Sequence, residues 1–123
     1  MAAKKEVTRI LVVEDEGDIC LLLELLLGGR KMIVDHVHTL TDAKEFIAKE
    51  QPSVVLLDNR LPDGLGIDFI GYLKQEYPQI KIIMITGVDG IAEDAVLATG
   101  ADKFITKPFT QAQLQQSVNQ VLN

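Results

Sequence analysis

The sequence is short of several residues that mark particular protein classes. It has no tryptophan, one cysteine and only 5% aromatic residues. A single cysteine cannot form an internal disulfide, and Cys20 fits the reducing cytoplasm, where we expect the protein to be. Basic residues are also scarce, with 12 Lys and Arg against 18 Asp and Glu. At a net charge of −6, nucleic-acid phosphates are poor partners for this domain.

Long apolar runs are missing as well. The most apolar segment, residues 19–27, contains Glu24 and is too short to span a bilayer. Residues 1–6 carry charges with no apolar segment behind them, which is not the pattern of a secretion signal. We therefore expect no membrane contact. The 123 residues predict one domain, with residues 1–8 as an N-terminal extension and with an output domain either absent or cut away.

Strand-like apolar runs alternate with amphipathic segments along the chain. Strands are expected at Arg9–Val13, Met32–Val37, Val54–Asp58, Ile80–Thr86 and Asp102–Thr106. Helices are expected at Glu16–Leu27 before Gly28-Gly29, at Leu40–Lys49, Gly66–Tyr77 and Ile91–Thr99, and from about Thr110 to the end. This alternation predicts an α/β domain with a parallel sheet.

The composition of the strands predicts their order. The first, third and fourth strands are apolar on both faces, as expected of central strands in a parallel sheet. The second and fifth contain polar residues such as Asp35 and Lys103, as expected of edge strands. With right-handed crossovers, this favours the order 2-1-3-4-5, a doubly wound sheet with helices on both faces. Ligands of such sheets bind at the carboxyl ends of the strands, near the point where the winding reverses.

Four of the strands end in polar residues. The ends carry Glu14 and Asp15, Asp58, Thr86, and Lys107 respectively, so these side chains are expected to form one site. Several carboxylates this close need a cation, and an oxygen-only set suits Mg²⁺ better than zinc.

The same residues point to phosphoryl chemistry. A free carboxylate at Asp58 can attack a phosphoryl donor, Lys107 and Thr86 can bind the phosphoryl oxygens, and Gly87 leaves room. His36 and His38 lack ligand-spaced partners and are expected to be ordinary edge-strand residues.

Four motifs in order resemble those of a known family. They are Val12-Val13-Glu14-Asp15-Glu16, Leu57-Asp58-Asn59-Arg60-Leu61-Pro62-Asp63-Gly64, Ile85-Thr86-Gly87, and Gly100 to Phe109. Together they make the chain similar to the receiver domains of two-component response regulators, from Arg9 to the last helix. The resemblance implies the flavodoxin-like fold and a signalling switch rather than a metabolic enzyme.

The resemblance also implies roles for individual residues. Asp58 would be the phosphoacceptor, held with Thr86 and Lys107 as the catalytic set. Mg²⁺ would be bound by Glu14, Asp15, Asp58 and the backbone carbonyl of Arg60, with no other cofactor. Thr86 would move toward the phosphoryl group as Phe104 turns inward, and the Lys107–Pro108 bond would be cis.

The partners implied are a sensor histidine kinase or phosphotransfer protein, and an output domain or target protein. Phosphorylation would change the surface of the fourth helix, fifth strand and fifth helix. The last helix carries glutamines where one large subfamily has a dimer-forming arginine, which leaves a homodimer open. Arg60 and Val88, two residues after Asp58 and Thr86, stand where receivers tune the loss of the phosphoryl group.

Three alternatives remain at this stage. Leu21 and Leu25 would point outward if Ile19, Leu22, Leu23 and Leu26 face the sheet, either as scattered surface residues or as a docking face for a kinase or dimer partner. A small-molecule phosphohydrolase is disfavoured, because Arg60 stands where such enzymes usually place a second acid. The alternative function is a phosphorylation-independent interaction module on a receiver scaffold.

Overall fold

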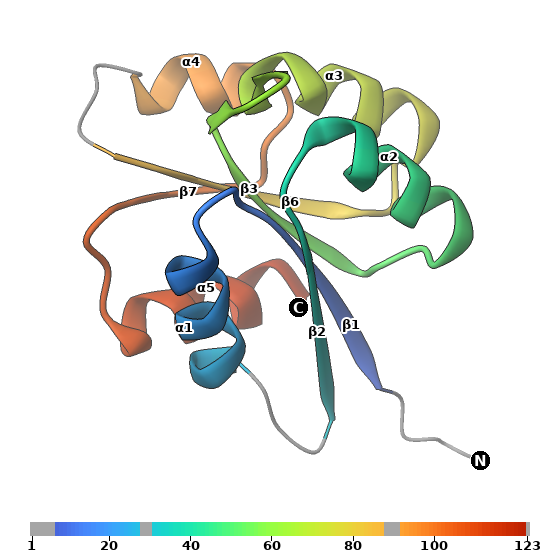
Figure 1. Cartoon of the computed structure of the whole chain (residues 1–123). Coiled ribbons are helices and arrows are strands. Elements are labelled where there is room, and N and C mark those ends of the chain that lie inside the picture. The colour runs from blue at the N-terminus through green and yellow to red at the C-terminus, as the bar shows by residue number, and fades with distance from the viewer. Residues whose placement is uncertain (1–6, 28–30, 88–91, 123) are drawn as a thin grey trace.

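The computed structural model describes residues 7–27, 31–87 and 92–122. Its main sheet has five parallel strands in the order β2–β1–β3–β6–β7 (Figure 1). The bounds are β1 Thr8–Val13, β2 Met32–Val37, β3 Val54–Asp58, β6 Lys81–Thr86 and β7 Lys103–Thr106. Counted without the short strands β4 and β5, this is the predicted order 2-1-3-4-5, with the two polar strands at the edges.

The helices lie on both faces of the sheet. Their bounds are α1 Gly17–Leu27, α2 Leu40–Lys49, α3 Gly66–Glu76, α4 Glu93–Ala98 and α5 Gln111–Leu122. Figure 1 shows α1 and α5 on one face and α2, α3 and α4 on the other. Helix α4 begins at Glu93 and ends one residue before the predicted end at Thr99. Its predicted start at Ile91 lies outside the described residues, as does the predicted stop of the first helix at Gly28-Gly29. Within the described ranges, no helix is long and apolar enough to cross a membrane.

Strands β1, β3 and β6 separate two hydrophobic cores. Alternate residues, such as Leu11 and Leu57, face α2, α3 and α4, while Val12 and Leu56 face α1 and α5. All four are at most 1% exposed, and burying a large aliphatic side chain contributes roughly 1.5–3 kcal/mol. The central strands are therefore firmly held, and so are the polar residues at their carboxyl ends.

A small hairpin directly follows β3. Strands β4 (Arg60–Leu61) and β5 (Gly64–Leu65) pair antiparallel around Pro62-Asp63, and neither was among the five strands expected from the sequence. Gly64 has φ of +153°, a conformation that side-chain-bearing residues rarely adopt. The hairpin delivers the chain to α3 and places its loop against the start of α2.

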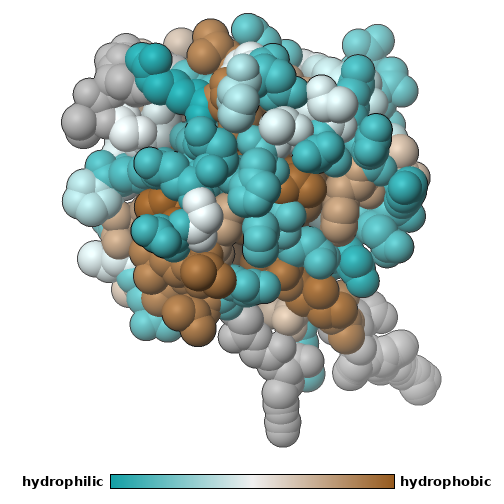
Figure 2. Space-filling view, viewed as in Figure 1, coloured by the Kyte–Doolittle hydropathy of each residue, from teal (hydrophilic) through white to brown (hydrophobic). Residues whose placement is uncertain are grey.

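The exposed leucines of α1 form an apolar patch. Leu23 is buried and Ile19 and Leu26 are half-buried, as expected, but the prediction for Leu22 was wrong because that side chain is 42% exposed. The buried stripe runs instead through Cys20, Leu23 and Leu27, at i, i+3 and i+7. Leu21 and Leu25 point outward as predicted, at 57% and 80% exposure. Figure 2 shows an apolar cluster over α1.

Candidate functional site

Three carboxylates converge at the carboxyl ends of β1 and β3. Glu14 and Asp15 follow β1, and Asp58 is the last residue of β3. One oxygen from each of the three lies within 4.8 Å of the others. Glu14 is only 2% exposed and Asp58 8%, whereas Asp15 is exposed. The predicted cluster is therefore present, because parallel neighbouring strands bring their carboxyl ends to one edge.

Lys107 supplies the positive charge of the site. Its Nζ lies 3.1 Å from Glu14 Oε1 and 3.6 Å from Asp58 Oδ1. The loop that carries it follows β7, and the backbone N–H of Lys107 donates to the Thr86 carbonyl at 2.8 Å. The Lys107–Pro108 peptide bond is cis, as the resemblance implied. Lys107, which follows β7, therefore lies beside the acids that follow β1 and end β3.

Burial and charge shift the protonation of these groups. Burial, then the charge of Asp58, raises the pKa of Glu14 to about 7. Burial also raises the pKa of Asp58, against the opposing effect of Lys107. Burial alone would lower the pKa of Lys107, but the Asp58 and Glu14 carboxylates outweigh it and raise that pKa. A cation bound beside Glu14 and Asp58 would favour their ionised forms, because burial has raised the pKa of both groups.

The donor set fits a hard divalent cation. Carboxylate oxygens are the ligands that Mg²⁺ prefers, and it usually keeps several waters beside a few protein oxygens. Asp15, Asp58 and Arg60 line one cleft of about 300 Å³ together with Thr86, Gly87 and Lys107. The residues named for metal and phosphoryl binding are therefore neighbours, and all of them except the buried Glu14 line this cleft.

Thr86 and Gly87 end β6 beside Asp58. Thr86 is 1% exposed, at the last position of the strand. Apart from its chain neighbours, no atom of the described residues lies within 4 Å of a Cβ built on Gly87, so the described side of this residue is open. This agrees with the expectation that Gly87 leaves room. Val88, the predicted tuning position, lies outside the described residues.

Asn59 has a structural role that the sequence reading missed. It is 2% exposed, and its backbone N–H donates to Asp58 Oδ1 at 2.8 Å. Its side-chain oxygen accepts from the Ile67 N–H at 3.0 Å, and its carbonyl accepts from the Gly66 N–H at 2.7 Å. Asn59 therefore joins the Asp58 carboxylate to the first turn of α3. A polar residue right after a buried strand was the only signal.

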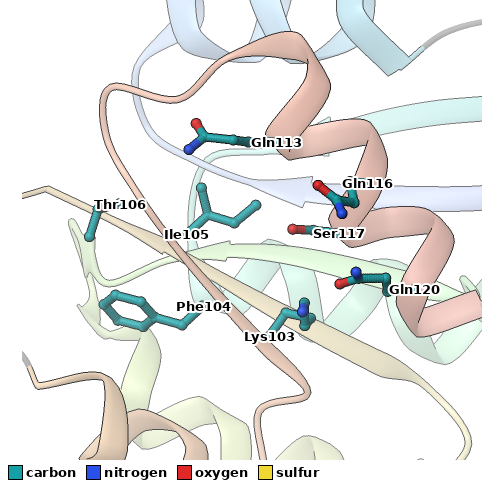
Figure 3. Close-up of a pocket in the computed structure, with 8 residues that line it drawn as sticks. All are labelled: Lys103, Phe104, Ile105, Thr106, Gln113, Gln116, Ser117 and Gln120. Carbon is teal, nitrogen blue, oxygen red and sulfur yellow. The ribbon is translucent and has the colours of Figure 1, made fainter.

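Phe104 does not line the acidic cleft. It is half-buried on β7 and packs against the core on the α2–α4 face of the sheet. Figure 3 shows its ring on the side of β7 away from Gln113, Gln116 and Gln120 of α5. Phe104 is thus separated from the cleft. The residues near it that line the cleft are Thr86, at the end of the paired strand β6, and Lys107, three residues further along the chain.

Comparisons with known proteins agree with this geometry. The response regulator receiver domain family matches residues 10–119. Among curated proteins, the chain is 38% identical over 112 residues to the response regulator protein PilR of Pseudomonas aeruginosa, covering 89% of this chain and 25% of that protein. It is 37% identical over 118 residues to the phosphate regulon transcriptional regulatory protein PhoB of Escherichia coli, covering 93% and 51%.

Solved structures show the same fold. The CheY-like receiver domain protein of Methanospirillum hungatei has a TM-score of 0.88 at 27% identity, covering 95% of this chain and 94% of that one. The BeF3-activated receiver domain of Klebsiella pneumoniae RstA has a TM-score of 0.87 at 30% identity, covering 94% and 99%. The chain spans about a quarter to about half the length of the curated relatives named above. It belongs to the response regulator receiver domain family of two-component systems.

Proposed function

We propose that this chain is a phosphorylation-activated switch of a two-component phosphorelay, in which Asp58 accepts a phosphoryl group from a sensor histidine kinase or phosphotransfer protein. One observation carries the proposal. The Asp58 carboxylate lies between two further acids and an ammonium 3.6 Å away, at the edge of an open cleft. Few structural roles would justify crowding these charges, whereas phosphoryl transfer uses each of them.

The positions of the side chains support the following reaction. An Asp58 oxygen attacks phosphorus, the new P–O bond forms, and the P–N bond of a phosphohistidine breaks with its electron pair going to the imidazole. Lys107 then faces the incoming phosphoryl oxygens and balances their charge. Glu14, Asp15, Asp58 and the backbone carbonyl of Arg60 would hold Mg²⁺. Bound there, Mg²⁺ would neutralise charge on the carboxylates and the transferred group.

The response would reach the surface through Thr86 and Phe104. Thr86 follows the phosphoryl group, and Phe104 on the neighbouring strand changes its packing against the α4 side of β7. The surface that changes comprises α4, β7 and α5, and an output domain or target protein would read it. One similar structure is a beryllofluoride-activated NtrC4 receiver domain dimer, so we include a homodimer among the outcomes. The reaction would take place in the cytoplasm, within a domain that spans the whole chain.

Intact mass after incubation with Mg²⁺ and acetyl phosphate tests the proposal. We expect one added phosphoryl group that requires both Mg²⁺ and Asp58, with Asp58→Asn as the control. If the native chain gains no phosphoryl group and binds no Mg²⁺, the proposed switch is rejected. That result would favour the phosphorylation-independent interaction module instead.

A further inference from the structure

The carbonyl oxygen of Glu14 accepts two side-chain hydrogen bonds from residues with no part in the proposed reaction. Cys20 Sγ lies 3.3 Å from it and His38 Nδ1 lies 3.0 Å from it. A carbonyl only accepts, so His38 must carry a proton on Nδ1. The backbone N–H of Glu14 donates to the Val37 carbonyl at 3.0 Å. Two of these three bonds come from the end of β2 and the residue after it.

The hairpin loop that follows Asp58 is hydrogen-bonded to the start of α2, close to His38 in the chain. The Asp63 carboxylate accepts from the backbone N–H groups of Leu40 and Thr41, at 2.9 and 3.0 Å, and from Thr41 Oγ1 at 2.8 Å. These are the first turn of α2, where a carboxylate is favourable, and the bonds lower the pKa of Asp63. Asp63 lies in the hairpin loop that follows Asp58.

The segment His38–Thr41 is therefore attached to both loops. At one end His38 holds the backbone of Glu14, and at the other the start of α2 holds Asp63. We propose that this segment, the β2–α2 junction, is a strap. It fixes the distance between the loop after β1, which begins with Glu14, and the hairpin that follows Asp58. The positioning residues are His38 within the strap and Asp63 in the hairpin loop that the strap holds. The inference rests on the proposed function, because it concerns how the same acids are held.

The strap would add to the packing of β1 and β3 by opposing the mutual repulsion of the three carboxylates. Without a bound cation the repulsion favours moving the two loops apart. Hydrogen bonds to the backbone, outside the cleft, oppose that motion without occupying any carboxylate oxygen of the Glu14–Asp15–Asp58 cluster. Supporting contacts of this kind commonly set how well a metal site binds, since they hold its ligands in place before binding.

Mg²⁺ affinity of the full chain, measured by calorimetry, tests the strap. We expect His38→Ala to weaken Mg²⁺ binding about three- to tenfold, less than the roughly tenfold to hundredfold typical for partners of ligand side chains, because His38 contacts only backbone. His38→Asn keeps an N–H donor near the position of Nδ1 and should restore most of the affinity. Asp63→Ala should also weaken binding, and the double variant should lose less than the product of the two effects.

Two further measurements separate positioning from simple stability. His36→Ala removes an exposed imidazole whose ring centroid is 5.6 Å from that of His38, and it should leave Mg²⁺ affinity unchanged. The free energy of unfolding without Mg²⁺ is recorded for every variant. Variants that lose stability yet bind Mg²⁺ like the native chain would overturn the strap. So would a His38→Asn variant as weak as His38→Ala.

The strap and the proposed function fail in different ways. A native chain that binds Mg²⁺ but takes no phosphoryl group from acetyl phosphate would reject the phosphoacceptor role, while the affinities still decide the strap. A native chain that is phosphorylated, with His38→Ala phosphorylated at the same rate and with the same Mg²⁺ affinity, would overturn the strap alone.

Discussion

Adding a single methyl group at Gly66 should strongly destabilise the fold. Gly66 is the buried first residue of α3 and sits directly against the end of β3. A Cβ at this position would lie well inside van der Waals contact of the Asp58 carbonyl oxygen, 3.1 Å from the Asp58 carbonyl carbon and 3.0 Å from Leu57 Cγ. Both neighbours belong to the most firmly packed strand, so Gly66→Ala must displace α3, the hairpin or Asp58 itself.

The cost follows from what must move. Overpacking of this kind costs typically about 1–3 kcal/mol, and backbone on both sides places Gly66→Ala near the upper limit. The displacement also lengthens two hydrogen bonds. One runs from the Gly66 N–H to the Asn59 carbonyl, and the other from the Ile67 N–H to the Asn59 side-chain oxygen. Alanine's better helix propensity returns at most about 1 kcal/mol. We expect a net loss of about 2–3 kcal/mol in the free energy of unfolding.

Gly71→Ala is the matched control within the same helix. Gly71 is exposed, and a Cβ there would meet no atom within 4 Å in the described residues outside its own helix backbone and chain neighbours. The same chemical change should therefore stabilise the domain by about 0.5–1 kcal/mol through helix propensity alone. Urea unfolding followed by far-UV circular dichroism measures both variants. If the free energies of unfolding of Gly66→Ala and Gly71→Ala differ by less than about 0.5 kcal/mol, the steric argument is wrong.

Three further predictions concern the charges and the apolar patch. Lys107→Ala should slow phosphorylation of Asp58 by acetyl phosphate roughly 10²–10³-fold, the usual effect of losing one charge stabiliser, and Lys107→Arg should slow it less; equal rates in all three proteins would exclude the role. Because the pKa of Glu14 is raised from 4.5 to about 7, the native state binds more protons than the unfolded chain in that window. Stability without Mg²⁺ should therefore fall as pH rises from 5 to 8, and saturating Mg²⁺ should flatten this trend in thermal unfolding scans. Replacing Leu21 and Leu25 by Lys should reduce phosphotransfer from a kinase or the oligomer size in light scattering if α1 is a docking face, and no change in either would make them ordinary surface leucines.

Sequence reasoning was most successful where the hydrophobic pattern was strong. Runs such as residues 10–13 and 54–57 are short and apolar at every position, which favours a strand buried on both faces, and the structure buries them in this way. From this follow the central strands, the polar edge strands and the meeting of Glu14, Asp15 and Asp58. Hydrophobic pattern and parallel geometry together are enough to bring these acids together.

The failures share a different cause. Strands β4 and β5 have two residues each, too few to show any period, and Leu22 was misplaced because a leucine-rich helix offers more than one apolar face. Asn59 and His38 are more informative cases. Asn59 bonds to a residue eight positions along the chain, and His38 to one 24 positions back. Such contacts depend on the three-dimensional arrangement, which no local pattern of residue types encodes.

The distribution of packing also indicates where the proposed response to phosphorylation would be taken up. Asp58 ends a strand that is buried at every position, so a phosphoryl group on it can shift β3 very little. Phe104, in contrast, is only half-buried on an edge strand and lies on the side of the sheet covered by the six-residue helix α4. Rearranging this aromatic disturbs fewer buried contacts than any change in the central strands. We therefore expect Phe104→Leu to leave phosphorylation of Asp58 intact while altering the spectral changes that phosphorylation causes in β7 and α4, measured as amide chemical shifts. Unchanged shifts in those elements would mean that the signal leaves the site by another route.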